Sequence, residues 1–182
     1  MSDLVIRPLV SADVAQLQNL HAKLLPVTYP SSFFLHLLIR DSHSCVVALH
    51  CSEPVAWVSA SFHRTNELLG SEPHIQLLTL GVLPRYRHRG LAKRLIGEVI
   101  TLLHKDHSVP IPLVYTHVCT SNAPAQAFYE HIGMKPFVSK PTGALYVAKN
   151  MYSPHSAWHV TSESRNLFES RDAYILVGKV SA

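Results

Sequence analysis

The sequence predicts an α/β protein of the α+β type, folded as a single domain over residues 1–182. A chain of 182 residues suits one domain, since domains usually run to roughly 100 to 200 residues. Hydrophobic residues make up 47% of the chain and charged residues only 15%, which excludes intrinsic disorder as its main state. Short β-rich runs alternate with segments of helical periodicity, so both strands and helices are expected.

The first half of the chain predicts a strand, two helices and a hairpin that leads into a further strand. Apolar residues at spacings of three and four after Ser11 indicate the first helix, and Ser32 is expected to cap a second helix that ends near Arg40. Two prolines within residues 25–30 keep these helices apart. The polar turn 51–54 suits a hairpin between two β-rich runs. The strands expected in this half are residues 4–6, 45–49, 55–62 and 75–83.

The second half predicts two helices alternating with strands and one long connection. The elements expected here are helix 91–105, strand 112–118, helix 125–132, strand 134–138 and strand 173–177. Residues 139–171 are rich in Ser, Pro, Asn and His and exceed an ordinary connection of about 4 to 6 residues. They are expected to form a flap, a partly ordered insertion, or a strand extended by a loop.

Charge, cysteine and histidine content narrow the classes of function only a little. The net charge of +4 and the pI near 9.1 permit contact with nucleic acid, a ribosome or an anionic cofactor and require none of them. The 13 histidines and three cysteines show no metal-ligand spacing, so no metal site is predicted. Neither a membrane span of roughly 18 apolar residues nor a signal peptide is recognisable. A cytoplasmic location is expected, with the nucleus as the alternative.

Residues 79–92 form the most informative stretch, a strand that passes through a basic turn into an amphipathic helix. Backbone N–H groups and the positive end of the helix dipole converge at such a helix start and suit a diphosphate. Gly90 and Ala92 leave room for the anion, and Arg85, Arg87 and Arg89 add positive charge. The alternative is a solvated basic helix start. The stretch is neither a Walker loop nor a Rossmann fingerprint.

The segment Arg87-His88-Arg89-Gly90-Leu91-Ala92 resembles the Arg/Gln-x-x-Gly-x-Gly/Ala acetyl-CoA pyrophosphate loop of the GNAT-superfamily N-acetyltransferases. The order of expected elements also agrees, so the resemblance covers nearly the whole chain. It implies a GNAT fold, a mixed and mostly antiparallel central sheet of about seven strands flanked by about four helices, with acetyl-CoA as cofactor. Within that superfamily, three segments resemble the catalytic subunit of NatE, of the fungal type: residues 25–29, residues 78–87, and residues 115–118 with Ser121-Asn122 and Phe128-Tyr129.

The resemblance also implies roles for individual residues. It implies acetyl-CoA contacts from Leu80, Val82, Arg87, His88, Arg89, Gly90, Leu91, Ala92, Asn122 and Tyr129. It implies substrate contacts from Leu25, Pro26, Val27, Tyr29, Tyr115 and His117. An apolar pocket from the first three would suit a Met side chain, and Tyr29 would hydrogen-bond the peptide backbone.

Acetyl transfer requires a neutral amine, whereas an α-amino group with a pKa of about 8 is mostly protonated at pH 7. His117 and Tyr115 are two apart on one expected strand and therefore share a face. The resemblance assigns His117 as the catalytic base and Tyr129 as the group that protonates the thiolate or packs on the cofactor. Gln76 lies where active family members carry a water-ordering tyrosine. Glutamine can hold a water by hydrogen bonds but cannot accept the proton.

The leading hypothesis is a NatE-type N-α-acetyltransferase that acts on Met-initiated, Met-Leu-like polypeptides. Its expected partners are nascent or mature polypeptide N-termini, NatA-type scaffold and catalytic subunits and the ribosome, with no membrane. One alternative is acetylation of a lysine or a small amine, because the fold hosts many acceptors. Another is a non-catalytic, acetyl-CoA-binding subunit, which Gln76 keeps open. A nucleic-acid-binding module built on the arginine cluster ranks below these.

Overall fold

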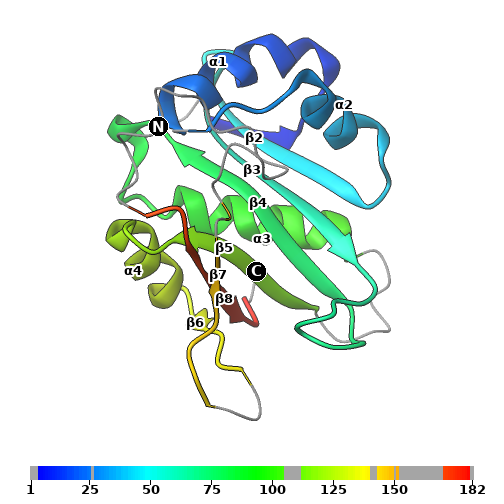
Figure 1. Ribbon diagram of the computed structural model, residues 1–182. Coiled ribbons are helices and arrows are strands. Elements are labelled where there is room, and N and C mark those ends of the chain that lie inside the picture. The colour runs from blue at the N-terminus through cyan, green and yellow to red at the C-terminus, as the bar shows by residue number, and fades with distance from the viewer. Residues whose placement is uncertain are drawn as a thin grey trace.

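The computed structural model describes residues 4–25, 27–104, 112–139, 143–149, 151 and 170–180, and its elements are shown in Figure 1. The α-helices in these ranges are α1 (Val14–Leu24), α2 (Ser31–Ile39), α3 (Leu91–Leu103) and α4 (Ala123–His131). The strands are β1 (Leu4–Pro8), β2 (His43–His50), β3 (Glu53–His63), β4 (His74–Val82), β5 (Leu113–Cys119), β6 (Lys135–Pro136), β7 (Val147–Ala148) and β8 (Ala173–Gly178). Within the described ranges, no helix combines the length and the apolar character needed to cross a membrane.

All eight strands join one open sheet in the order β1-β2-β3-β4-β5-β8-β6, and β7 also pairs with β8. Every pairing is antiparallel except that of β4 with β5. The last strand in the sequence, β8, therefore lies between β5 and β6 and not at an edge. The mixed, mostly antiparallel sheet and the helix count of the described part confirm the predicted fold class.

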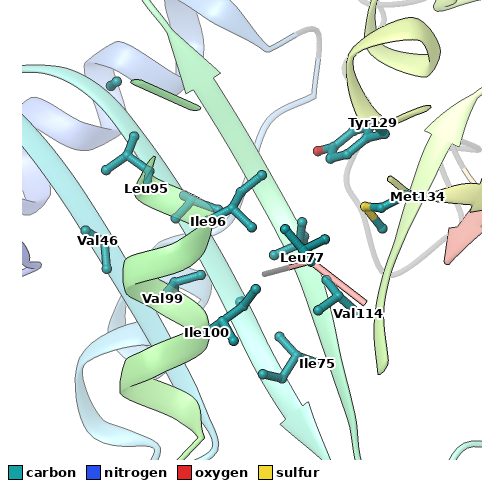
Figure 2. Close-up of a cluster of buried hydrophobic side chains, with 14 of the residues drawn as sticks. Val46, Ile75, Leu77, Leu95, Ile96, Val99, Ile100, Val114, Tyr129 and Met134 are labelled. Carbon is teal, nitrogen blue, oxygen red and sulfur yellow. The ribbon is translucent and has the colours of Figure 1, made fainter. Parts of the chain in front are cut away.

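Helices cover both faces of the sheet, and strand periodicity decides which side chains each face receives. On β2, Val46 and Ala48 join the core under α3, whereas Cys45, Val47 and Leu49 join the core under α1 and α2. A period of two on each strand explains this split. Figure 2 shows the α3 face: Leu95, Ile96, Val99 and Ile100 pack on Ile75 and Leu77 of β4 and Val114 of β5.

The predicted cap of α2, Ser32, is wrong by two residues. The helix begins at Ser31, and the preceding residue, Pro30, has φ −67° and ψ 156° and makes no side-chain capping bond. The proline ring fixes φ close to the helical value, so helical geometry can begin directly after Pro30 without a capping hydroxyl.

The long connection after β6 takes a partly strand-like form. Val138 bridges Leu145, the Tyr146 N–H donates to the Phe137 carbonyl at 3.0 Å, and β7 then pairs with the start of β8. Of the expected forms, the described part matches a strand extended by a loop. Residues 152–169 lie outside the described residues, and the predictions for them stay untested.

His21 on α1 is an ionisable residue inside the core under α1 and α2. Its side chain is 2% exposed, its ring stacks on Trp57 with centroids 4.1 Å apart, and neither ring nitrogen has a hydrogen-bond partner among the described residues. Burial lowers the pKa of His21 to about 3. The imidazole is therefore neutral in the folded chain over the whole range in which it titrates when unfolded.

Replacing His21 by leucine is expected to make folding less sensitive to acid. Because the pKa is lowered, the unfolded chain binds a proton below pH 6.5 and the folded chain does not until about pH 3, so stability falls as the pH falls through this window. Between pH 8 and pH 5 the wild type should lose about 2 kcal/mol that His21→Leu retains. Denaturant unfolding at both pH values measures this difference, and equal losses in the two proteins would contradict it.

Candidate active site

The central feature of the site is a fork between β4 and β5. The two strands pair in parallel from His74 with Leu113 to Leu77 with Thr116, and the pairing stops there although both strands continue. Opposite the fork, the register between β3 and β4 shifts by one residue, which leaves Leu78 as a bulge. A bulge bends its strand and increases the local twist. The second half of β4 is thus directed away from β5, and the fork opens.

The open edge of β4 presents backbone groups to the fork. The Leu83 N–H donates to the Val55 carbonyl on the β3 side. Since successive residues of a strand point their backbone groups to opposite edges, those of Val82 and Leu80 are directed to the fork side. The Val82 carbonyl accepts from Arg87 Nε at 2.9 Å, which ties the next loop to the strand.

The loop between β4 and α3 turns sharply just before the helix begins. His88 has φ +57° and Gly90 has φ +74°, so both lie in the left-handed region, and Leu91 opens α3 directly afterwards. The first N–H groups of a helix have no intrahelical acceptor and carry the positive end of its dipole. Left-handed turns of this kind also gather backbone N–H groups around a concavity that binds anions. Exposed Arg85, Arg87 and Arg89 add positive charge.

A cavity of about 420 Å³ lies over β4, β5 and β8, on the sheet face that also carries α1 and α2. Gln76 of β4 pairs with Tyr115 of β5, one residue before the point where the two strands separate, and both side chains line this cavity. The described lining residues are Asn66, Glu67, Leu68, Leu69, Gln76, Tyr115, His117, Tyr146, Ala148, Met151 and Ile175. The closed end of the fork therefore adjoins the cavity at Gln76 and Tyr115.

A chain of hydrogen bonds crosses the wall of the cavity. Asn66 Nδ2 donates to the Tyr115 phenol at 3.2 Å, and that phenol donates to Gln76 Oε1 at 3.1 Å. Gln76 Nε2 lies 3.4 Å from His117 Nδ1, a long contact in which the amide donates to the ring nitrogen. Burial lowers the pKa of His117 to about 4, so its imidazole is neutral at pH 7.

The fork, the loop and the cavity have a counterpart among known proteins. Residues 14–134 match the Acetyltransferase (GNAT) family, and this match covers about two thirds of the chain. The chain belongs to the GNAT acetyltransferase family. Membership of this family makes it an acetyl-CoA-dependent acetyltransferase with acetyl-CoA as its cofactor.

Three known proteins illustrate what this GNAT chain is similar to. The histone acetyltransferase MCC1 of Arabidopsis thaliana is 29% identical over 144 residues, which cover 69% of this chain and 58% of that protein. N-alpha-acetyltransferase 50 of Danio rerio is 24% identical over 150 residues, which cover 78% of this chain and 85% of the relative. Arabidopsis thaliana NAA60 in complex with a bisubstrate analogue has a TM-score of 0.71 at 25% identity, over 96% of this chain and 97% of that one. The GNAT chain spans less than two thirds of the length of the first relative.

The residues around the fork of this GNAT chain fit acetyl-CoA. The free edge at Leu80 and Val82 offers backbone groups to an extended amide-containing chain, and the left-handed loop with the first turn of α3 suits a diphosphate. Around Gly90, a Cβ atom would meet nothing within 4 Å, so the space beside the backbone is open. Arg87, His88, Arg89, Gly90, Leu91 and Ala92 all lie in this loop or helix start.

Alanine at Gly90 is expected to weaken acetyl-CoA binding about tenfold or more. A left-handed φ costs a non-glycine residue about 1 to 2 kcal/mol, and relaxing it moves the N–H groups of the loop. Gly133→Ala is the matched control, because Gly133 also has a positive φ and open space but follows α4. Calorimetric titration with acetyl-CoA should show the loss in Gly90→Ala alone. Equal affinities in the two variants would contradict the prediction.

The other residues predicted to act in catalysis or to bind acetyl-CoA are placed as follows. Tyr129 on α4 is buried in the core under α3, near Met134 in Figure 2. Burial raises the pKa of Tyr129 to about 12, so its phenol keeps its proton at pH 7. Asn122 caps α4 by accepting the Ala125 N–H at 3.2 Å. The roles of Tyr129 and Asn122 toward acetyl-CoA stay predictions.

The described residues of the predicted substrate loop are not among those that line the cavity. Leu25, Val27 and Tyr29 are absent from the described lining residues, and Pro26 lies outside the described residues. Tyr29 packs on His21 and Phe33, with centroids 5.4 and 4.6 Å away, and burial raises its pKa. The role of this loop in substrate binding stays a prediction, whereas Tyr115 and His117 lie in the cavity as their shared strand face predicted.

Sequence reasoning missed the loop between β3 and β4, which lines the cavity with residues from Asn66 to Leu69. The sequence offered a weak signal, a polar stretch that contains the Leu68-Leu69 pair between two strands. Tyr146, just before β7, also lines the cavity. The loop and Tyr146 both reach the cavity because strands that are distant in the sequence pair with one another in the sheet.

Proposed function

We propose that this GNAT acetyltransferase is a NatE-type N-α-acetyltransferase whose acceptors are Met-initiated, Met-Leu-like protein N-termini. The observation that carries the proposal is that the cavity containing His117 meets the fork at Gln76 and Tyr115. An acceptor amine can thus approach from one face of the sheet while acetyl-CoA lies in the fork. The relatives named N-alpha-acetyltransferase support a protein N-terminus as the acceptor.

The residues of the site divide the chemistry as follows. Bound acetyl-CoA supplies an acetyl group activated as a thioester. His117 is neutral at pH 7 and relays the proton of the acceptor ammonium to water. Nδ1 takes up the proton as its long contact with the Gln76 amide breaks, and Nε2 releases its own proton, so the ring stores no charge at a pKa of about 4. Gln76 orients His117 through the amide contact. The backbone N–H groups of Leu80 and Val82 are directed to where negative charge develops on the acyl oxygen.

A peptide panel tests this proposal. Purified protein with acetyl-CoA is offered Met-Leu, Met-Val and Ser N-terminal peptides and an N-terminally acetylated peptide with an internal lysine, and products are measured by mass. Acetylation of the Met peptides in preference to the Ser peptide is the expected result. Turnover on the lysine peptide alone would refute an N-terminal acceptor.

A lysine acceptor is the second candidate, because one relative is named a histone acetyltransferase. The panel distinguishes it directly. The third candidate is a non-catalytic subunit. It is based on Gln76, whose amide cannot accept a proton at this position of the site. It predicts acetyl-CoA binding without turnover and a gain of activity in Gln76→Tyr.

We also propose that the protein works in the cytoplasm, on nascent chains near the ribosome and together with NatA-type scaffold and catalytic subunits. The basic balance of the chain supports contact with an anionic surface such as ribosomal RNA. Co-sedimentation with ribosomes in low and high salt tests this location.

A further inference from the structure

The loop between β3 and β4, residues 64–73, forms one wall of the cavity that holds His117. Four consecutive residues of the loop line it: Asn66, Glu67, Leu68 and Leu69. The remaining described lining residues come from β4, β5, β7, β8 and the residues that flank β7. An acceptor bound near His117 therefore contacts this loop.

Asn66 holds the loop in one position. Its Oδ1 accepts the Leu68 and Leu69 N–H groups at 2.9 and 3.1 Å, and its backbone exchanges two hydrogen bonds with Gly70 at 2.9 and 2.8 Å. Its Nδ2 donates to Tyr115 at 3.2 Å, which ties the loop to β5. The side chain of the next residue, Glu67, thus leaves the backbone from a fixed point at the cavity.

Glu67 is the single charged side chain among the described residues that line the cavity. His117 adds no charge at pH 7 because burial keeps it neutral. The two ion pairs in the described part of the chain, Arg7 with Asp13 and Lys149 with Asp172, do not include Glu67. The described part of the acceptor site therefore carries one negative charge, and Glu67 is exposed at its rim.

We propose that Glu67 makes the site discriminate by charge among Met-initiated acceptors, favouring a basic over an acidic side chain directly after the first residue. This inference rests on the proposed N-terminal acetyltransferase function. A carboxylate at a solvated rim attracts a nearby cation and repels a nearby anion with modest energy. Each of the two effects therefore changes kcat/KM only a few-fold. Together they separate a basic from an acidic second residue by about tenfold.

The test compares kcat/KM on Met-Lys, Met-Gln and Met-Glu peptides of otherwise identical sequence. Wild type is expected to favour Met-Lys over Met-Glu by about tenfold, with Met-Gln between them. Glu67→Gln should bring the ratio close to one, and Glu67→Lys should invert it. Glu72→Gln is the matched control, because Glu72 is an exposed glutamate that does not line the cavity, and it should keep the wild-type ratio.

Failure of this inference differs from failure of the proposed function. A ratio that stays the same in wild type, Glu67→Gln and Glu67→Lys would overturn the role of Glu67 while N-terminal acetylation stands. If only internal lysines are acetylated, the same ratio is read on lysine peptides with basic or acidic neighbours. If no peptide turns over, the affinities of the Met-Lys and Met-Glu peptides are measured in the presence of CoA instead. Affinities that are the same in wild type and in the Glu67 variants would refute the inference.

Discussion

Replacing His117 by alanine is expected to lower kcat for peptide acetylation by roughly a hundredfold or more, the usual contribution of a positioned general base. His117 lies in the cavity within reach of Gln76, on the strand that forms one side of the fork. Its removal takes away the group that receives the amine proton but no atom of the fork or the diphosphate loop. Acetyl-CoA affinity should therefore change little. Steady-state kinetics measure the loss of kcat, and calorimetric titration measures the affinity.

The control for this variant is His43→Ala. His43 is also a half-buried strand histidine whose pKa burial lowers, but it lies at the start of β2 and does not line the cavity. A pH profile adds a second readout. Because the pKa of His117 is lowered to about 4, wild type should keep its base unprotonated well below pH 6.5, and the acid limb should lie near pH 4 to 5. Equal losses of kcat in both variants would refute the role of His117.

The parts of this fold that depend on neighbours in sequence could be predicted. The start of α3 at Leu91 followed from Gly90 and the apolar periodicity after it, and the same short segment identified the diphosphate loop. The shared face of Tyr115 and His117 followed from strand alternation alone. Each of these depends on residues only a few positions apart.

The parts that depend on distant pairing could not be predicted. The insertion of β8 between β5 and β6 pairs residues 54 to 64 positions apart on the β5 side and 40 to 42 apart on the β6 side, and the hydrogen bond of Asn66 with Tyr115 spans 49 positions. Nothing in the sequence near Leu25 to Tyr29 shows that Tyr29 packs on His21 and Phe33, because direction into a core is a tertiary property. The contact between Trp57 and Gly81 could not be predicted either. A single glycine within a strand indicates that some group approaches closely, but not which one.

Alanine at Gly81 is expected to lower the free energy of unfolding by about 3 kcal/mol, at the upper end of overpacking effects. A Cβ atom on Gly81 would overlap the six-membered ring of Trp57, which is fully buried. The ring has little room to move, since it stacks on His21 and its Nε1 donates to Thr79 Oγ1 at 2.8 Å. For a chain of this size the loss corresponds to a fall in Tm of roughly 6 to 12 °C.

The Trp57→Leu variant shows whether the clash itself is the cause. Alone it should destabilise the protein by about 3 to 5 kcal/mol, because it leaves a cavity in the core. In the Trp57→Leu background, however, Gly81→Ala should cost at least 1 kcal/mol less than in wild type, since the overlapping ring atoms are gone. Strictly additive losses in a double-mutant cycle would refute the clash. Because Gly81 lies between Leu80 and Val82, a shift of β4 in Gly81→Ala should also weaken acetyl-CoA binding, and Trp57→Leu should restore part of that affinity.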